Sequence, residues 1–141
     1  MKVKIKRLDK NAVIPTYAKA DDAGMDLVAI SLDIDEINGQ ANYGTGLAFE
    51  IPAGYVGLIF PRSSIRKTVL SLTNCVGVID SGYRGEVSLT FRVHDAFEKT
   101  YRVGERIGQI IIMPYPQIEF EEVDEMSTTE RGAGGFGSTG N

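Results

Sequence analysis

Residues 86–93, EVSLTFRV, alternate polar and apolar side chains with a period of two. In an extended strand successive side chains point to opposite faces, so the pattern gathers its apolar members on one face. Such alternation is typical of a strand that buries one face and exposes the other, and it predicts a half-buried β-strand. The core-facing side chains would be Val87, Leu89, Phe91 and Val93, and the outward ones Ser88, Thr90 and Arg92.

Alternation or a short apolar run recurs outward from this stretch in both directions. Lys2–Arg7 alternates again, and the other candidate strands are Leu27–Leu32, Gly46–Ile51, Val56–Phe60, Val76–Ile79, Arg106–Met113 and Ile118–Val123. Gly, Pro and Asn at turn positions separate these segments. One short helix is expected from Ser64 to about Leu70, capped by Ser63 or Ser64. Many short strands at close spacing predict an all-β fold, a sandwich or a barrel.

The composition fits one domain with its own core, because the chain has 141 residues of which 43% are hydrophobic. Its single cysteine, Cys75, cannot form an internal disulfide and favours a reducing, cytoplasmic environment. We expect it to be a small buried apolar side chain. No apolar run approaches the roughly 18–20 residues that span a membrane, so no membrane attachment is expected. A net charge of −4 argues against stable nucleic-acid binding.

The segment Pro61–Lys67 carries the first candidate chemistry. An apolar strand runs into Arg62, Ser63 and Ser64, and a short helix is expected to follow. Serine hydroxyls and helical N–H groups donate hydrogen bonds, and an arginine can grip two phosphate oxygens at once. The pattern suits a phosphate cradle, although an ordinary capped helix with solvated charges is the preferred explanation when the segment is taken alone.

The segment Asn74–Glu86 is expected to form a β-hairpin, in which a buried strand ends in Asp80 and a tight turn precedes a second strand. Asp80 could orient or deprotonate a water molecule, and Tyr83 offers a flat face against which a sugar can pack. The alternative for Asp80 is a turn residue that binds its own backbone.

Three further segments add polar residues. Asp26 lies at the entry to a strand, and Arg106 and Gln109 flank the start of another. The last eleven residues, from Arg131, contain several glycines and the aromatic Phe136. Such a tail cannot pack a core, and it is either a frayed end or a lid that carries an anion grip and a stacking ring.

Together these segments resemble, in the same order, the five motifs of the trimeric dUTP pyrophosphatases. The corresponding ranges are Ala23–Leu27, Pro61–Lys67, Gly77–Glu86, Gly104–Gln109 and Arg131–Gly140. The ordered set spans nearly the whole chain and is far more specific than any one motif. The departures are Val69, where the family often has glycine at the helix end, Gly108, where alanine is common, and a compact stretch from Asp33 to Tyr43.

The resemblance implies an activity and a role for each matching residue. The activity is hydrolysis of dUTP to dUMP and pyrophosphate with Mg²⁺, which limits uracil incorporation into DNA and supplies dUMP for dTMP synthesis. Asp80 would position the water that attacks the α-phosphorus, and Tyr83 would pack under the deoxyribose and exclude a 2′-hydroxyl. The residues implied to read the uracil edge are Asn74, Gly77, Val78 and Ile79.

The remaining implied roles concern the triphosphate and the metal. Arg62, Ser63, Ser64 and Gln109 would hold the α- and β-phosphates. The γ-phosphate would meet Arg131 with Gly137, Ser138 and Thr139, while Phe136 stacks on uracil. No residue would bind Mg²⁺ directly, since the phosphates and water hold it, and Asp26 would act indirectly by steering water or orienting an arginine.

The implied fold is a jelly-roll-like distorted barrel of the dUTPase-like β-clip type, with one short helix, assembled as a homotrimer. Residues 1–126 would form the catalytic barrel, and residues 127–141 an arm that closes over an active site. Two other functions stay open. A dCTP deaminase shares the fold but uses a glutamate and lacks the glycine-rich fifth motif, and a nucleotide-binding switch would signal to a regulatory protein partner of unknown identity.

Overall fold

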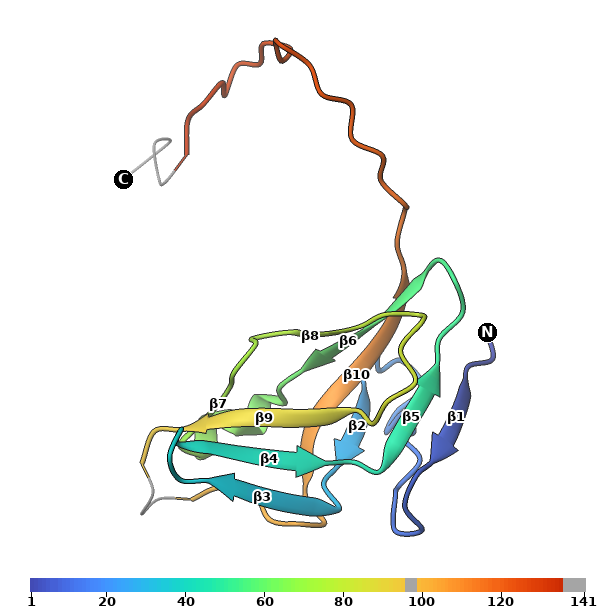
Figure 1. The fold of residues 1–141 in the computed structure, drawn as a ribbon, viewed down its shortest axis with the longest axis vertical. Coiled ribbons are helices and arrows are strands. Elements are labelled where there is room, and N and C mark those ends of the chain that lie inside the picture. The colour runs from blue at the N-terminus through green and yellow to red at the C-terminus, as the bar shows by residue number, and fades with distance from the viewer. Residues whose placement is uncertain (96–98, 136–141) are drawn as a thin grey trace.

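The structure, a computed structural model, describes residues 1–95 and 99–135 (Figure 1). Its described part contains ten β-strands and one short 3-10 helix. The strands are β1 (Lys4–Arg7), β2 (Met25–Val28), β3 (Ser31–Asp35), β4 (Gln40–Gly44), β5 (Leu47–Glu50), β6 (Tyr55–Phe60), β7 (Leu70–Leu72), β8 (Gly77–Ile79), β9 (Ser88–Val93) and β10 (Arg106–Pro114), and the helix is η1 (Ser63–Lys67). The predicted run Leu27–Leu32 is divided between β2 and β3.

Two four-stranded antiparallel sheets form the body of the protein, with strand orders β2-β10-β6-β8 and β3-β4-β9-β7. A separate two-stranded ribbon pairs β1 with β5. In Figure 1 the two larger sheets lie across one another, and the chain passes from β4 of one sheet into β5 of the ribbon. The expected all-β, jelly-roll-like fold with one short helix is thereby confirmed.

The core lies between the two larger sheets, and the face of β9 that was predicted to be apolar is buried in it. Val87, Leu89 and Phe91 are buried, whereas Ser88 and Arg92 are exposed. Phe91 packs edge-on against Tyr43 and Tyr101, with ring centroids 5.7 and 5.8 Å away. The Tyr43 hydroxyl donates a 2.8 Å hydrogen bond to the Tyr101 carbonyl, and burial raises the pKa of Tyr43. This aromatic cluster fixes the loop that leads into β10.

The helix is shorter than predicted and has no serine cap. It covers only Ser63–Lys67, its N-cap residue is Arg62, and no side chain caps it. At its end the backbone N–H and the hydroxyl of Thr68 both donate to the Ile65 carbonyl, at 2.9 and 2.7 Å. These bonds stop the helix with Thr68 in an extended conformation, so no left-handed residue is needed where Val69 replaces the family's glycine. The chain then enters β7.

The predicted hairpin between residues 74 and 86 is wrong. β8 pairs with β6, whereas β9 pairs with β4 and β7 in the other sheet. The chain crosses between sheets after Asp80, and the Val87 N–H joins the Leu47 carbonyl at 2.8 Å. Cys75, expected in the interior, is exposed and has a positive φ of 59° in the turn before β8.

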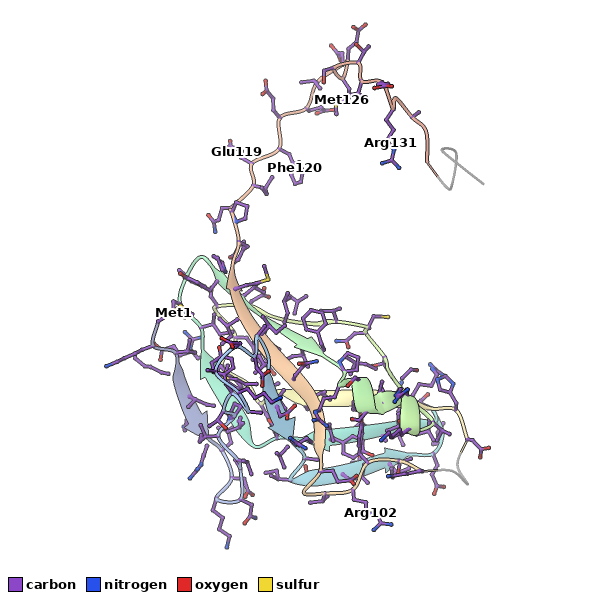
Figure 2. The ribbon with its side chains drawn as sticks, turned by 180° about the vertical axis from the view of Figure 1, so that it is seen from behind. Met1, Arg102, Glu119, Phe120, Met126 and Arg131 are labelled. Atoms are coloured by element: carbon purple, nitrogen blue, oxygen red, sulfur yellow. The ribbon has the colours of Figure 1, made fainter. Side chains whose placement is uncertain are left out.

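The predicted strand Ile118–Val123 is also absent. β10 ends at Pro114, and from Met113 to Ala133 every residue is exposed. Figures 1 and 2 show this segment running away from the body, with Phe120 and Arg131 far from the sheets. Pro114 and Pro116 have no N–H to donate, which prevents a regular continuation of the ladder. Beyond Pro116 the apolar side chains of Ile118, Phe120 and Met126 are 66%, 93% and 84% exposed, so they bury little surface within the described chain.

Candidate functional site

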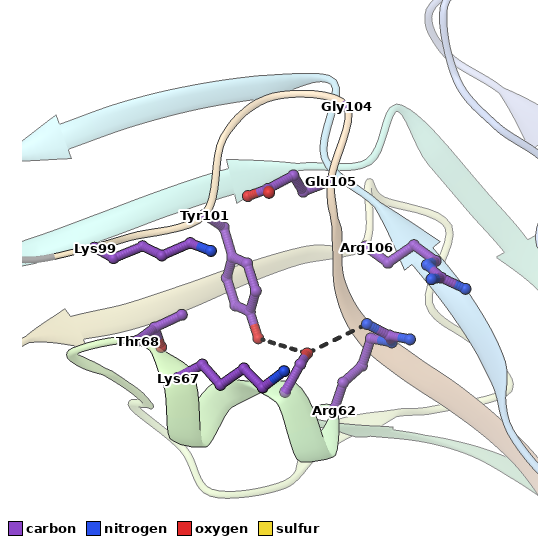
Figure 3. Close-up of a pocket in the computed structure, with 9 residues that line it drawn as sticks. Arg62, Lys67, Thr68, Lys99, Tyr101, Gly104, Glu105 and Arg106 are labelled. Atoms are coloured by element: carbon purple, nitrogen blue, oxygen red, sulfur yellow. Dashed lines mark hydrogen bonds between the residues drawn. The ribbon is translucent and has the colours of Figure 1, made fainter.

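A pocket of about 290 Å³ lies where β6 runs into η1 and where β10 begins (Figure 3). Its lining is cationic and hydroxyl-bearing with one acid, Glu105. The lining residues are Arg62, Ser64, Lys67, Thr68, Lys99, Tyr101, Gly104, Glu105 and Arg106. Such a donor set suits an anion with several oxygens, and we call this pocket the cationic pocket.

Asp26 organises the arginines of this pocket from β2. Its Oδ1 accepts from Arg62 Nε at 2.6 Å and its Oδ2 accepts from Arg106 Nη1 at 3.0 Å. The side chains of Asp26 and Arg62 are each only 24% exposed, so this ion pair is partly shielded from water. The contact arises because β10 pairs with β2 on one side and β6 on the other, and Gln109 lies opposite both Asp26 and Phe60.

The two serines of the predicted cradle have different surroundings. Ser64 Oγ accepts from Arg62 Nη1 at 3.2 Å and lies 3.5 Å from the Tyr101 hydroxyl (Figure 3). Ser63 is exposed and does not line the cationic pocket. Sequence reasoning missed Lys99 and Tyr101, which come from a loop without any recognisable motif. The only feature of the sequence that could have pointed to this loop was the aromatic Tyr101, shortly before the strand that begins at Arg106.

Gln109 is positioned by close packing. Its Nε2 donates to the Pro61 carbonyl at 3.1 Å. A Cβ at Gly24 would overlap Gln109 Oε1 and lie 3.2 Å from its Cδ, so the glycine leaves room for the amide. Arg62 and Ser64 from one predicted phosphate segment and Gln109 from another are thus brought together, with Asp26 bound to Arg62.

A second, smaller pocket of about 180 Å³ lies beyond β8, and we call it the Asp80 pocket. Its lining residues are Val78, Ile79, Asp80, Tyr83, Glu86, Val87 and Ser88. The Tyr83 N–H donates to the Asp80 carbonyl at 3.0 Å, which closes a tight turn. The exposed Asp80 carboxylate accepts no hydrogen bond from the described residues. This geometry disfavours the alternative that Asp80 serves only to bind its own turn.

The other residues expected around the base lie along β8. Val78 is 61% exposed, and the Asn74 amide comes close to Gly77, since a Cβ there would lie 3.5 Å from Asn74 Nδ2. Gly77 packs on Ile59 of β6. The strand therefore presents free backbone edge and small or apolar side chains beside the Asp80 pocket.

The cationic pocket and the Asp80 pocket share no lining residue. Gly57 pairs with Ile79 and Ile59 with Gly77, so the next pair in that register would be Val56 and Asp80. Arg62 follows the opposite end of β6. From Val56 to Arg62 an extended chain rises roughly 20 Å, at about 3.3 Å per residue. The two halves of the predicted site therefore lie at opposite ends of one strand.

Of the predicted arm residues, the described one, Arg131, lines neither pocket. Arg131 is exposed, and its Nε donates to the Gly134 carbonyl at 3.0 Å (Figure 2). Phe136, Gly137, Ser138 and Thr139 lie outside the described residues.

The carboxylates around the cationic pocket bear on how a magnesium ion could bind. Within the described residues no three His, Cys, Asp or Glu side chains gather as a metal site, and each carboxylate oxygen of Asp26 already binds an arginine. The cations and hydroxyls of the cationic pocket suit phosphate oxygens instead. The residues therefore fit Mg²⁺ that arrives on a triphosphate and takes its ligands from phosphate and water.

The chain is similar over nearly its whole length to proteins of one known family. Residues 10–140 match the family model described as dUTPase. The deoxyuridine 5′-triphosphate nucleotidohydrolases of Nautilia profundicola and Gloeothece citriformis are 48% and 40% identical to the chain, with 99% of it covered by each. The alignments cover 99% and 97% of those two proteins.

Solved structures agree. The dUTPase of Staphylococcus bacteriophage 80alpha with dUPNHPP superposes with a TM-score of 0.82 at 31% identity, covering 99% of both chains. A mutant dUTPase of phage phi11 of S. aureus, described with a structural Mg(II) ion, has a TM-score of 0.76 at 25% identity, covering 89% of this chain and 98% of its own. In the described part of this chain, no helix is long and apolar enough to cross a membrane.

Proposed function

Because the chain belongs to the dUTPase family, we propose that it hydrolyses dUTP to dUMP and pyrophosphate at sites formed between the subunits of a homotrimer. The observation that carries this proposal is the separation of the cationic pocket from the Asp80 pocket. One nucleotide must reach both the base-reading strand and the phosphate donors, and a single chain holds these at opposite ends of β6. A neighbouring copy that brings its cationic pocket to the Asp80 pocket completes the site.

In a closed ring of three subunits, every Asp80 pocket can meet the cationic pocket of a neighbour. In a head-to-tail ring each subunit offers one surface to the neighbour on one side and a different surface to the other. Three such contacts complete three equal sites. The tail beyond Pro116 supports the same arrangement, since its apolar side chains Ile118, Phe120 and Met126 are largely exposed within the described chain.

Base and sugar selection belong to the Asp80 pocket. The exposed backbone of β8 around Val78 and Ile79, with Asn74 beside it, offers hydrogen-bonding groups to the edge of uracil. A thymine methyl would meet this backbone, and the cytosine amino group would present a donor where uracil presents an acceptor. The Tyr83 ring packs against the deoxyribose and leaves no space for a 2′-hydroxyl.

Phosphate binding belongs to the cationic pocket. Arg62 and Ser64 hold the α- and β-phosphates with Ser63 and Gln109, and Asp26 fixes the direction of the Arg62 guanidinium. Pre-oriented donors stabilise the charge that builds on the phosphates without reorganising during the reaction. Mg²⁺, when bound to the triphosphate, neutralises phosphate charge and helps pyrophosphate to leave.

Asp80 directs the nucleophile. Its carboxylate is exposed and unengaged within the described chain, so it can accept a proton or a hydrogen bond from a water molecule beside the α-phosphorus. Attack by that water breaks the bond between the α-phosphorus and the oxygen that bridges it to the β-phosphorus. That oxygen leaves with pyrophosphate. The products are dUMP and pyrophosphate.

Residues 127–141 act as an arm distinct from the barrel of residues 1–126. The arm carries Arg131 for the γ-phosphate and Phe136 for the uracil ring, with Gly137, Ser138 and Thr139 as backbone donors. Glycine lets N–H groups approach an anion closely. An arm that closes over bound nucleotide excludes bulk water from the reacting phosphate. The cytoplasmic location stays a prediction that accompanies this function.

The direct test is a product assay. The full chain is incubated with Mg²⁺ and, separately, dUTP, dCTP, dTTP and UTP, and products are separated by chromatography. We expect dUTP alone to be converted, to dUMP and pyrophosphate. Deamination of dCTP would contradict the proposal in favour of the deaminase, and tight dUTP binding without turnover would favour the nucleotide-binding switch.

Asp80→Asn tests the proposed nucleophile-directing role. The substitution preserves shape but removes the proton acceptor, so kcat for dUTP should fall by about 10²–10⁴-fold while dUTP binding is kept. Steady-state kinetics and calorimetric binding measure the two effects. Asp33→Asn, at an exposed carboxylate on β3, is the matched control and should retain wild-type turnover. Full activity in Asp80→Asn would remove Asp80 from this role.

Truncation after Met126 tests the proposed arm. The described part of the deleted segment is exposed apart from the half-buried Gly134 and Gly135, so the unfolding midpoint in urea should be unchanged at fixed protein concentration. The value of kcat/KM for dUTP should fall by at least about 100-fold, because the lid and its phosphate donors are gone. A truncated chain that unfolds would show that the arm belongs to the core.

A further inference from the structure

The Tyr83 ring lies directly over a residue that has no side chain. A Cβ at Gly85 would overlap the Tyr83 hydroxyl and would lie 2.6 Å from Cζ and 3.0 Å from Cε2 of the ring. The backbone of Gly85 is not in the left-handed region, where glycine is favoured for conformational reasons. Glycine is therefore needed at position 85 because the Tyr83 ring occupies the space of a side chain, and not because of its backbone conformation.

A hydrogen bond also holds the ring at this hydroxyl end. The Tyr83 hydroxyl donates to the Glu86 carbonyl at 3.0 Å. Arg84 Nη1 donates to the carbonyls of Ser81 and Tyr83, at 2.6 and 2.8 Å, and so closes the turn that carries the ring. Tyr83 is thus folded back along its own chain, anchored at its hydroxyl, with Gly85 as the surface on which it rests.

We propose that Gly85 is a specificity-determining position, which sets the location of the Tyr83 ring and thereby the discrimination between deoxyribose and ribose. The inference rests on the proposed function, in which Tyr83 packs against the sugar. The same ring lines the Asp80 pocket, so a shift of the ring changes the shape of the pocket wall. Gly85 itself touches no substrate and acts only through Tyr83.

The expected displacement is large enough to matter. Non-bonded heavy atoms prefer separations of about 3.5–4.0 Å, so a methyl group at position 85 forces the ring to retreat by roughly 1 Å. Exclusion of a 2′-hydroxyl depends on a steric difference between two sugars, and such a difference is lost when the wall moves by about the size of the excluded group. Tyr83 is 45% exposed and lies outside the core cluster, so its ring can move without disturbing the core, and stability should change little.

The test compares Gly85→Ala with Gly82→Ala in the same turn region. A Cβ at Gly82 would meet no atom within 4 Å, and its backbone is likewise outside the left-handed region, which makes it a matched control. The measured quantity is the ratio of kcat/KM for dUTP to kcat/KM for UTP. We expect Gly85→Ala to lower this ratio by at least about ten-fold, mainly through the two KM values, and Gly82→Ala to leave it unchanged.

A double-mutant cycle shows whether Gly85 acts through the ring. In the Tyr83→Ala background the ring is absent, so adding Gly85→Ala should leave the ratio where Tyr83→Ala alone has put it. An equal loss of selectivity in both backgrounds, or an unchanged ratio in Gly85→Ala with Tyr83 present, would overturn the inference. Should Gly85→Ala fail to fold, Gly85→Ala and Gly82→Ala are compared in the Tyr83→Phe background, which removes the hydroxyl nearest to the added Cβ, with the same expectation.

The proposed function is tested by the unmodified chain in the same assay. Failure of that chain to hydrolyse dUTP would remove the function and the inference together. Selective hydrolysis of dUTP by the unmodified chain, with Gly85→Ala equal to Gly82→Ala, would remove the inference alone.

Discussion

The antiparallel register of β6 and β8 is the constraint on which the rest of the account depends. Pairing of Gly57 with Ile79 places Asp80 beside the start of β6, while the arginine and serines of the cationic pocket follow its end. No side-chain rearrangement can close a gap set by the rise of a strand. We therefore propose that the chain carries two complementary half-sites and requires another copy to use them.

Within each half, backbone pairing and small residues fix the chemistry. β10 lies between β2 and β6, and this position lets Asp26 bind Arg62 and Arg106 together. Gly24 leaves room for the Gln109 amide, as Gly85 leaves room for Tyr83. Gly108, where the family often has alanine, faces the buried Leu89, whose Cδ2 a Cβ would overlap. At these positions a glycine is needed because it has no side chain. A neighbouring side chain occupies the space that a Cβ would take.

Patterns in the sequence predicted correctly those features that depend on neighbouring residues alone. Alternation along residues 86–93 gave the buried face of β9 correctly, because one buried face imposes a period of two. The hairpin expected from residues 74 to 86 failed, because partner choice is not local and β8 and β9 join different sheets. The run Ile118–Val123 looked like a strand but has no sheet edge beside it in the described chain. Motif resemblance selected Arg62, Ser64 and Asp80, whereas Lys99 and Tyr101 became visible only when the fold brought their loop to the cationic pocket.

Subunit complementation tests the shared site most directly. Asp80→Asn and Arg62→Ala variants are co-expressed with different tags, and mixed trimers that carry both tags are purified. Each parent is expected to be nearly inactive. In a mixed head-to-tail trimer about one site in three combines an intact Asp80 pocket with an intact cationic pocket, so dUTP hydrolysis should return to roughly a third of the wild-type rate. Mixed trimers no more active than the two parents would show that each site lies within one chain, and would contradict the account.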